Sequence, residues 1–153
     1  MNILVIGSGG REHAIVRKLK ENPKVETIYC IPGNGGIAAD AVCVAEIGAK
    51  DIPAQVAFAK AHDIGFAVVA PDDPLVLGAV DALEAAGIPC FGPKANAAII
   101  EGSKVFSKEL MKKYAIPTAD YRVFTDAAAA MDYVKTCPLP VVVKADGLAL
   151  GKG

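Results

Sequence analysis

Short apolar runs alternate with amphipathic segments over the first hundred residues of the chain. The runs are rich in β-branched side chains, which is typical of strands buried on both faces of a sheet. We expect strands at residues 3–6, 25–31, 41–45, 66–70 and 88–91. Because helical segments separate these strands, the pattern predicts an α/β fold, a Rossmann-like parallel sheet with helices on both faces.

Between the runs, apolar residues recur every three or four positions, as in helices that pack against a sheet. We expect helices from the end of the first glycine cluster to residue 21, and then at 51 or 52 to 62, 75–86 and 95–100. Pro53 suits the first turn of the second helix, and Gly87 suits the end of the third.

Three loops rich in turn-forming residues follow the first, second and fourth strands. They lie at Gly7, Gly33 and Pro71. Right-handed crossovers in a parallel sheet bring such loops to one edge, which is where open α/β sheets bind ligands.

The first loop has three glycines within four residues and leads directly into a helix. The free amides and partial positive charge of a helix N-terminus suit a phosphate or a carboxylate, and Arg11 adds a fork-shaped donor. Gly9, Gly10 and Arg11 are therefore candidate binding residues. The alternative is a tight turn without a ligand. His13, in the same helix, is expected to be packed or hydrogen-bonded within the protein.

The other two loops add further candidates to the same edge. They are Gly33 and Asn34 in the second loop, and Pro71 and Asp72 in the third. The carboxylates of Asp72 and Asp73 suit an amine or hydroxyl groups of a ligand, or else cap the following helix.

A dinucleotide site at the first loop is disfavoured. The fingerprint G-x-G-x-x-G is met at Gly7 and Gly9, but Glu12 stands at the third glycine position. A carboxylate there repels a pyrophosphate. The second strand also ends without the acidic residue that binds a ribose, so we expect neither NAD nor FAD.

A second unit is expected at residues 102–153, after a first domain of residues 1–101. Its expected elements are a helix at 103–114, a strand at 121–124, a helix at 125–136 and a strand at 141–145. Ser103 and Thr125 are placed to cap the two helices. These elements are too few to bury a core, so we expect the chain to be the N-terminal part of a longer protein.

The last eight residues form a glycine-rich segment that departs from the Walker pattern at both ends, where Asp146 and Gly153 stand. Glycine amides and a lysine, following a strand that carries Lys144, nevertheless suit a triphosphate. Lys104 lies in the first turn of a helix, where the dipole disfavours a cation unless an anion is bound. The candidate nucleotide-binding residues are Lys104, Lys144, Gly151, Lys152 and Gly153. The alternatives are a basic surface turn and a solvated lysine.

Composition narrows the classes of function. The net charge of -1 argues against a nucleic-acid partner, and no apolar run reaches the ~18 residues of a membrane span. The short apolar N-terminus is not typical of a signal peptide. Four cysteines without a CxxC pair predict reduced, mostly buried thiols in a cytoplasmic protein, and the two histidines show no metal-ligand spacing.

Several of these stretches, in this order, resemble the phosphoribosylamine–glycine ligase family of the ATP-grasp superfamily, along nearly the whole chain. They are GSGGREHA at 7–14, PGNGG at 32–36, FGP at 91–93, EGSK at 101–104 with Phe106 and Lys108, PTA at 117–119 with Tyr121, and KADGLALGKG at 144–153. The family usually has GPEAPL where this chain has APDDPL at 70–75. Asp72 keeps the carboxylate there, and Asp73 adds a charge.

The resemblance implies an ATP-dependent ligase of purine biosynthesis, in which glycine becomes an acyl phosphate that the amine of 5-phosphoribosylamine attacks. It implies that Lys104, Lys144 and the loop at Lys152 contact ATP, that the N-terminal loops hold the ribose phosphate, and that the magnesium ligands lie beyond Gly153. It assigns no catalytic residue. Two alternatives stay open: another ATP-grasp ligase, such as a carboxylase subunit, which residues 11–13 disfavour, and a non-catalytic nucleotide-binding module.

Overall fold

The computed structural model describes residues 1–149. The chain divides into two compact units, the first comprising residues 1–99 and the second beginning at residue 100. No helix among residues 1–149 is both long enough and apolar enough to cross a membrane.

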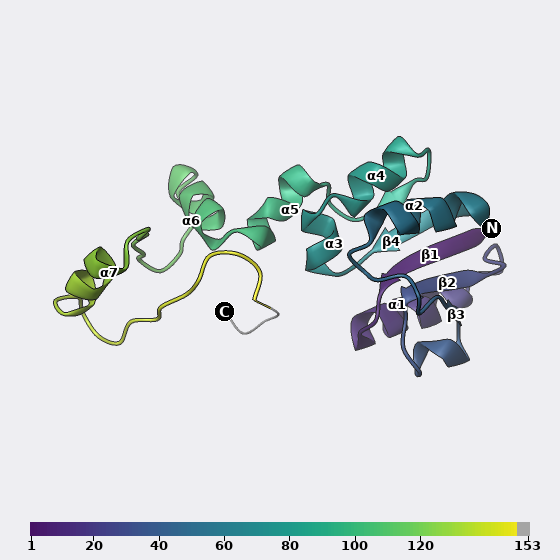
Figure 1. The fold of residues 1–153 in the computed structure, drawn as a ribbon, viewed down its shortest axis with the longest axis horizontal. Coiled ribbons are helices and arrows are strands. Elements are labelled where there is room, and N and C mark those ends of the chain that lie inside the picture. The colour runs from purple at the N-terminus through teal and green to yellow at the C-terminus, as the bar shows by residue number, and fades with distance from the viewer. Residues whose placement is uncertain (150–153) are drawn as a thin grey trace. The chain divides into compact units, whose positions relative to one another are not determined.

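The first unit is built on a five-stranded sheet in which every pairing is parallel (Figure 1). Its strands are β1 (Asn2–Gly7), β2 (Ile28–Pro32), β3 (Val42–Cys43), β4 (Ile64–Val69) and β5 (Cys90–Phe91). The order β3-β2-β1-β4-β5 places β1 at the centre and reverses the direction of winding there. In open α/β sheets, ligands bind beside the carboxyl ends of the strands at such a switch in strand order. Here the loop after β1 lies at that position.

Helices cover both faces of the sheet. The first unit contains α1 (Gly10–Lys20), the 3-10 turn η1 (Ile37–Ala39), α2 (Ile52–Ala61), α3 (Asp72–Val76), α4 (Ala79–Ala85) and α5 (Ala95–Gly102), whose C-terminal residues enter the second unit. The prediction of an α/β fold with a doubly covered parallel sheet is therefore confirmed.

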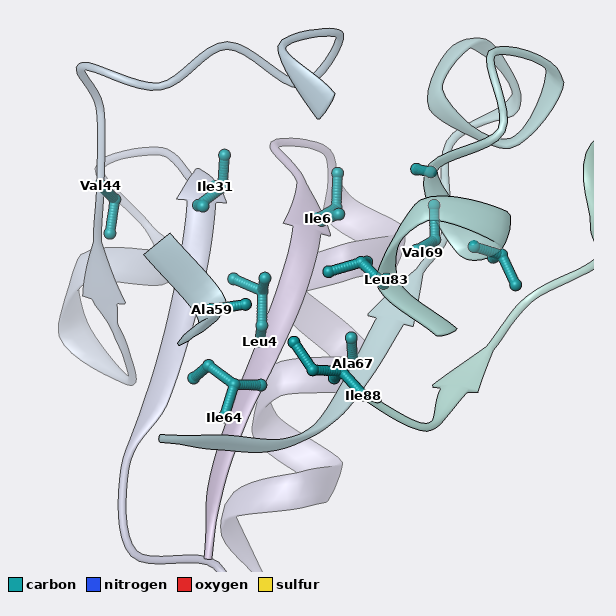
Figure 2. Packing of buried hydrophobic residues seen from close by; sticks show 12 residues of the cluster. Leu4, Ile6, Ile31, Val44, Ala59, Ile64, Ala67, Val69, Leu83 and Ile88 are labelled. Carbon is teal, nitrogen blue, oxygen red and sulfur yellow. The ribbon is translucent and has the colours of Figure 1, made fainter. Parts of the chain in front are cut away.

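Two cores result, because successive side chains of β1 point to opposite faces. Leu4 and Ile6 pack in one cluster with Ala59 of α2 and Leu83 of α4 (Figure 2). Their neighbours Ile3 and Val5 pack in a second cluster, together with Val16 of α1. The central strand is thus buried on both faces, which is why its sequence is continuously apolar.

The prediction of one helix at 75–86 is wrong. Two helices occupy this region, and α3 begins three residues earlier than expected. Gly78 separates them with a φ of +87°, a left-handed conformation that glycine adopts without strain and that cannot continue a helix. The second strand also begins later than expected, at Ile28, because the amides of Val25 and Glu26 bond outside the sheet, to Asn22 and Met1.

The second unit contains α6 (Lys104–Lys113) and α7 (Ala127–Val134). Ser103 caps α6 as predicted, since its hydroxyl accepts from the Phe106 amide. The cap of α7 is Asp126, which accepts from the Ala129 amide at 2.7 Å, so the prediction of Thr125 is wrong by one residue. A carboxylate at this position also interacts favourably with the helix dipole and so stabilises the helix.

The two strands predicted in the second unit, at 121–124 and 141–145, are absent from the part of the chain that the structure describes. A strand needs a neighbour to complete its hydrogen bonds, and the described part of this unit offers none. Val142 and Val143 are 76% and 81% exposed, and no residue between 100 and 149 is buried. The expectation that these elements are too few to bury a core agrees with this exposure.

Two leucines near each other in the sequence, Leu77 and Leu83, should differ in how much they contribute to the stability of the first unit. Leu83 is fully buried, whereas Leu77, just after α3, is 56% exposed. We expect Leu83→Ala to lower the free energy of unfolding by about 2–5 kcal/mol, because it removes buried contacts and leaves a cavity. Leu77→Ala is the matched control, with an expected loss within about 0.5 kcal/mol. Urea unfolding followed by circular dichroism measures both, and equal losses would contradict this core.

Candidate functional site

The glycine turn after β1 encloses the side chain of Glu12. This carboxylate is only 3% exposed, and its Oε2 accepts a hydrogen bond of 2.6 Å from the Gly9 amide. A Cβ added to Gly7 would lie 2.4 Å from Glu12 Cγ, and one added to Gly9 would lie 2.8 Å from Oε2. The group for which these two glycines make room is therefore Glu12 itself.

The sequence comparison with the dinucleotide fingerprint gives Glu12 only a repulsive role toward a pyrophosphate, whereas the structure gives it a role in the turn. Its structural role has a sequence signal, because a glutamate three residues after a helix N-cap commonly bonds back to the N-cap amide. Gly9 is the N-cap of α1, and Glu12 is the third helical residue. The Gly9 amide already has a carboxylate as its partner, which adds a geometric argument to the prediction that no dinucleotide binds here.

The second candidate loop is hydrogen-bonded directly to the first. The Gly33 amide donates to the Gly7 carbonyl at 3.1 Å, and Asn34 Nδ2 donates to the Ser8 carbonyl at 2.7 Å. The other end of the Asn34 amide, Oδ1, accepts from the backbone amides of Gly36 and Ile37. Asn34 therefore fixes the shape of both loops, a role that the sequence did not reveal.

An ion pair joins the third candidate loop to the first. Arg11 Nη2 lies 3.9 Å from Asp72 Oδ1, and both side chains are substantially exposed. Asp73 pairs instead with Lys50 Nζ at 2.6 Å, a partner that the sequence did not indicate. The N-cap of α3 is Pro71, and no side chain caps it. Asp72 and Asp73 therefore lie in the first turn of α3 but do not cap it.

All three loops thus meet at the carboxyl ends of the strands, as the topology predicts. The structure brings together the predicted residues Gly9, Gly10, Arg11, Gly33, Asn34, Pro71 and Asp72 on this edge. The first amides of α1 have no intrahelical acceptor, and the exposed guanidinium of Arg11 stands beside them. This arrangement suits the phosphate of a small ligand.

A charged cluster ties α1 to the segment that follows the second loop. His13 Nε2 lies 3.1 Å from Asp40 Oδ2, and Lys20 Nζ lies 3.0 Å from Asp40 Oδ1. These hydrogen bonds hold the pKa of the Asp40 carboxyl below its usual value, and the bond from His13 has the larger effect. His13 is thus partnered within the protein, as predicted, whereas the sequence did not single out Asp40.

Two thiols lie behind the same loops. Cys30 and Cys43 are register partners on β2 and β3, and they donate to the carbonyls of Gly7 and Asn34, respectively. Burial raises the pKa of the Cys30 thiol to about 12. All four cysteines are free, but only Cys30 is buried, so the prediction of mostly buried thiols is wrong. Within residues 1–149, no group of three or more His, Cys, Asp or Glu residues is placed to hold a metal ion.

In the second unit, Asp146 and Gly147 meet the start of α6. Lys104 Nζ donates to the Gly147 carbonyl at 2.6 Å, and Asp146 accepts from Ser103 Oγ and from the Val105 amide. The Val105 amide, and then Ser103, lower the pKa of the Asp146 carboxyl. Lys104 is thus not simply solvated.

Of the other residues predicted to bind the nucleotide, only Lys144 lies among the described residues. Lys144 is exposed and precedes Asp146 by two residues. Gly151, Lys152 and Gly153 lie outside the described residues.

A doubly wound parallel sheet, with its loops gathered at the switch in strand order, defines a ligand-binding α/β domain, and a second unit follows it. Two family models match this chain in succession. Residues 1–101 match "Phosphoribosylglycinamide synthetase, N domain", and residues 102–153 match "Phosphoribosylglycinamide synthetase, ATP-grasp (A) domain". The chain belongs to the phosphoribosylglycinamide synthetase family.

Curated relatives and a solved structure agree with this assignment. The chain is 56% identical over its whole length to the phosphoribosylamine–glycine ligase of Listeria monocytogenes serotype 4b, and 53% identical to that of Vibrio cholerae. It spans 36% of the length of each. The crystal structure of the phosphoribosylamine–glycine ligase of Thermotoga maritima superposes with a TM-score of 0.75 at 32% identity, covering all of this chain and 35% of that one.

The glycine turn generates a prediction about stability. Gly7 has a φ of +134° and lies against Glu12, so Gly7→Ala adds both backbone strain and a steric clash. We expect a loss of more than about 2 kcal/mol in the free energy of unfolding. Gly10→Ala is the matched control, because a Cβ there meets nothing within 4 Å and the residue is helical. It should be neutral, or stabilising by up to about 1 kcal/mol. Similar losses for both variants would contradict the packing of Glu12.

Proposed function

We propose that the enzyme containing this chain is an ATP-dependent ligase that joins glycine to 5-phosphoribosylamine, giving glycinamide ribonucleotide, ADP and phosphate in cytoplasmic purine biosynthesis. Its partners are then small molecules: glycine, the ribosylamine and ATP. The proposal is carried by the gathering of three loops at the switch in strand order, in a chain whose relatives bear the name of this ligase. Hydrogen bonds join the first loop to the second, and an ion pair joins the first to the third.

The chemistry has two balanced steps. The γ-phosphoryl group of ATP passes to a carboxylate oxygen of glycine, releasing ADP and forming an acyl phosphate. The amine of 5-phosphoribosylamine then attacks the carbonyl carbon, loses a proton and expels phosphate as the amide forms. Phosphoryl transfer depends chiefly on positioning and on neutralising charge, which magnesium and lysines supply.

The N-terminal loop edge holds the phosphorylated ribose in this proposal. The first amides of α1 and the guanidinium of Arg11 bind the phosphate, while Gly33 and Asn34 keep the adjoining loop in place. The pair between Arg11 and Asp72 is long and exposed, so breaking it costs little. Arg11 is therefore free to turn to a phosphate, and Asp72 to a ribose hydroxyl.

In the second unit, Lys104 and Lys144 contact the nucleotide, together with the predicted loop at Gly151, Lys152 and Gly153. The acids of this unit after Phe124 are all engaged within the protein: Asp126 caps α7, Asp132 pairs with Lys135, and Asp146 bonds to the start of α6. We therefore place the magnesium ligands beyond Gly153.

This placement predicts that the 153-residue chain does not catalyse the ligation. The test compares it with the full-length enzyme in an assay of phosphate release from ATP, with magnesium, glycine and fresh 5-phosphoribosylamine. We expect release that depends on glycine from the full-length enzyme alone. Absence of this release from the full-length enzyme would contradict the proposed function. Comparable turnover by the chain would contradict the placement of the active site.

Arg11 gives a sharper test in the full-length enzyme. We expect Arg11→Ala to raise the KM for 5-phosphoribosylamine by about tenfold or more, because a charged hydrogen bond to phosphate is lost, and to leave the KM for ATP nearly unchanged. Arg17→Ala is the matched control, since Arg17 is exposed in the last turn of the same helix, away from the loop edge. An unchanged KM for the ribosylamine in Arg11→Ala would exclude this role for Arg11.

A further inference from the structure

Residues 103–105 and 146–147 form a compact hydrogen-bonded contact, which we call the clasp, although Ser103 and Asp146 are 43 positions apart in the sequence. Ser103 Oγ donates to both oxygens of the Asp146 carboxylate, at 3.2 and 3.0 Å. The Val105 amide donates to Asp146 Oδ1 at 3.1 Å, and Lys104 Nζ donates to the Gly147 carbonyl at 2.6 Å. Three consecutive residues at the start of α6 thus hold two consecutive residues of the glycine-rich segment.

The donor and acceptor roles in the clasp are complementary. An ionised carboxylate only accepts hydrogen bonds, and a helix N-terminus only donates them. Ser103 serves both partners, because its hydroxyl accepts from the Phe106 amide while it donates to Asp146. The partial positive charge at the start of α6 further favours Asp146.

Packing does little to fix this part of the chain. No residue from 100 to 149 is buried, and neither α6 nor α7 has a buried side chain. Directional hydrogen bonds therefore set the position of Gly147 relative to α6. Lys144 lies two residues before Asp146, so the clasp also holds its backbone within about 7 Å of the anchor.

We propose that Asp146, through its bonds to Ser103 and Val105, is the positioning residue that brings Lys104 and the segment carrying Lys144 together for nucleotide binding. This inference rests on the proposed function. Asp146 does not touch the nucleotide in this account. It accepts hydrogen bonds at the start of α6. The partner of Lys104 is a neutral carbonyl, so this bond does not neutralise the lysine charge, which can still meet a phosphate.

The test uses Asp146→Asn, Ser103→Ala and the double variant in the full-length enzyme. We expect each single variant to raise the KM for ATP by about tenfold, the effect of losing a hydrogen bond to a charged group, while the KM for 5-phosphoribosylamine stays within about twofold. Because both residues act through one contact, the double variant should be no worse than either single one. Ser103→Thr keeps the hydroxyl and should restore the wild-type KM for ATP.

The matched control is Asp126→Asn. Asp126 is also a carboxylate that accepts from a backbone amide at a helix start in the same unit, but it caps α7. Its variant should leave the KM for ATP unchanged. A readout without activity is amide exchange of Val105 in the 153-residue chain. Asp146→Ala, which removes the acceptor, should accelerate it, and Asp126→Ala should not.

The outcomes separate the two proposals. A full-length enzyme that releases no glycine-dependent phosphate overturns the proposed function. If the enzyme is active and Asp146→Asn keeps the wild-type KM for ATP, the positioning role is overturned. It is also overturned if the double variant raises the KM for ATP by the product of the two single increases. Unchanged exchange at Val105 in Asp146→Ala also overturns the clasp. A raised KM for ATP shared by the two single variants, rescued by Ser103→Thr and absent from Asp126→Asn, supports it.

Discussion

The hydrogen bond from the Gly9 amide to the buried carboxylate of Glu12 is the interaction on which the candidate site depends. It fixes the turn between β1 and α1, and the Gly7 carbonyl of that turn accepts the Gly33 amide. Glu12 Oε1 is buried and has no hydrogen-bond partner among the described residues, with Arg11 Nε 3.9 Å away. Burying such a group lowers the stability of the domain, so other interactions must offset this cost.

That cost is met by the two cores on either side of β1. Leu4 and Ile6 on one face, and Ile3 and Val5 on the other, are buried along the central strand. Burial on this scale is the main source of stability in a domain of this size. The loops of the candidate site begin at the ends of β1, β2 and β4, so the packing of these strands positions them.

The second unit follows a different physical rule. Its described residues are all at least partly exposed, and apolar side chains such as Val142 and Val143 are largely exposed. What organises it is polar: caps at Ser103 and Asp126, and the clasp at Asp146. Hydrogen bonds in exposed positions are weak individually, so this unit depends on their cooperation far more than the sheet does.

The sequence by itself determined the parallel α/β fold, the positions of most helices and strands in the first unit, and the gathering of three loops at one edge. These follow from local periodicity and from the handedness of βαβ crossovers, which need no knowledge of distant contacts. Only the tertiary structure decided the break at Gly78, the enclosure of Glu12, and the partners of Asn34, Asp40 and Asp146. Most of these depend on which side chains meet across long sequence separations. The strands predicted at 121–124 and 141–145 failed for the same reason, because a strand exists only where another strand supplies its hydrogen bonds.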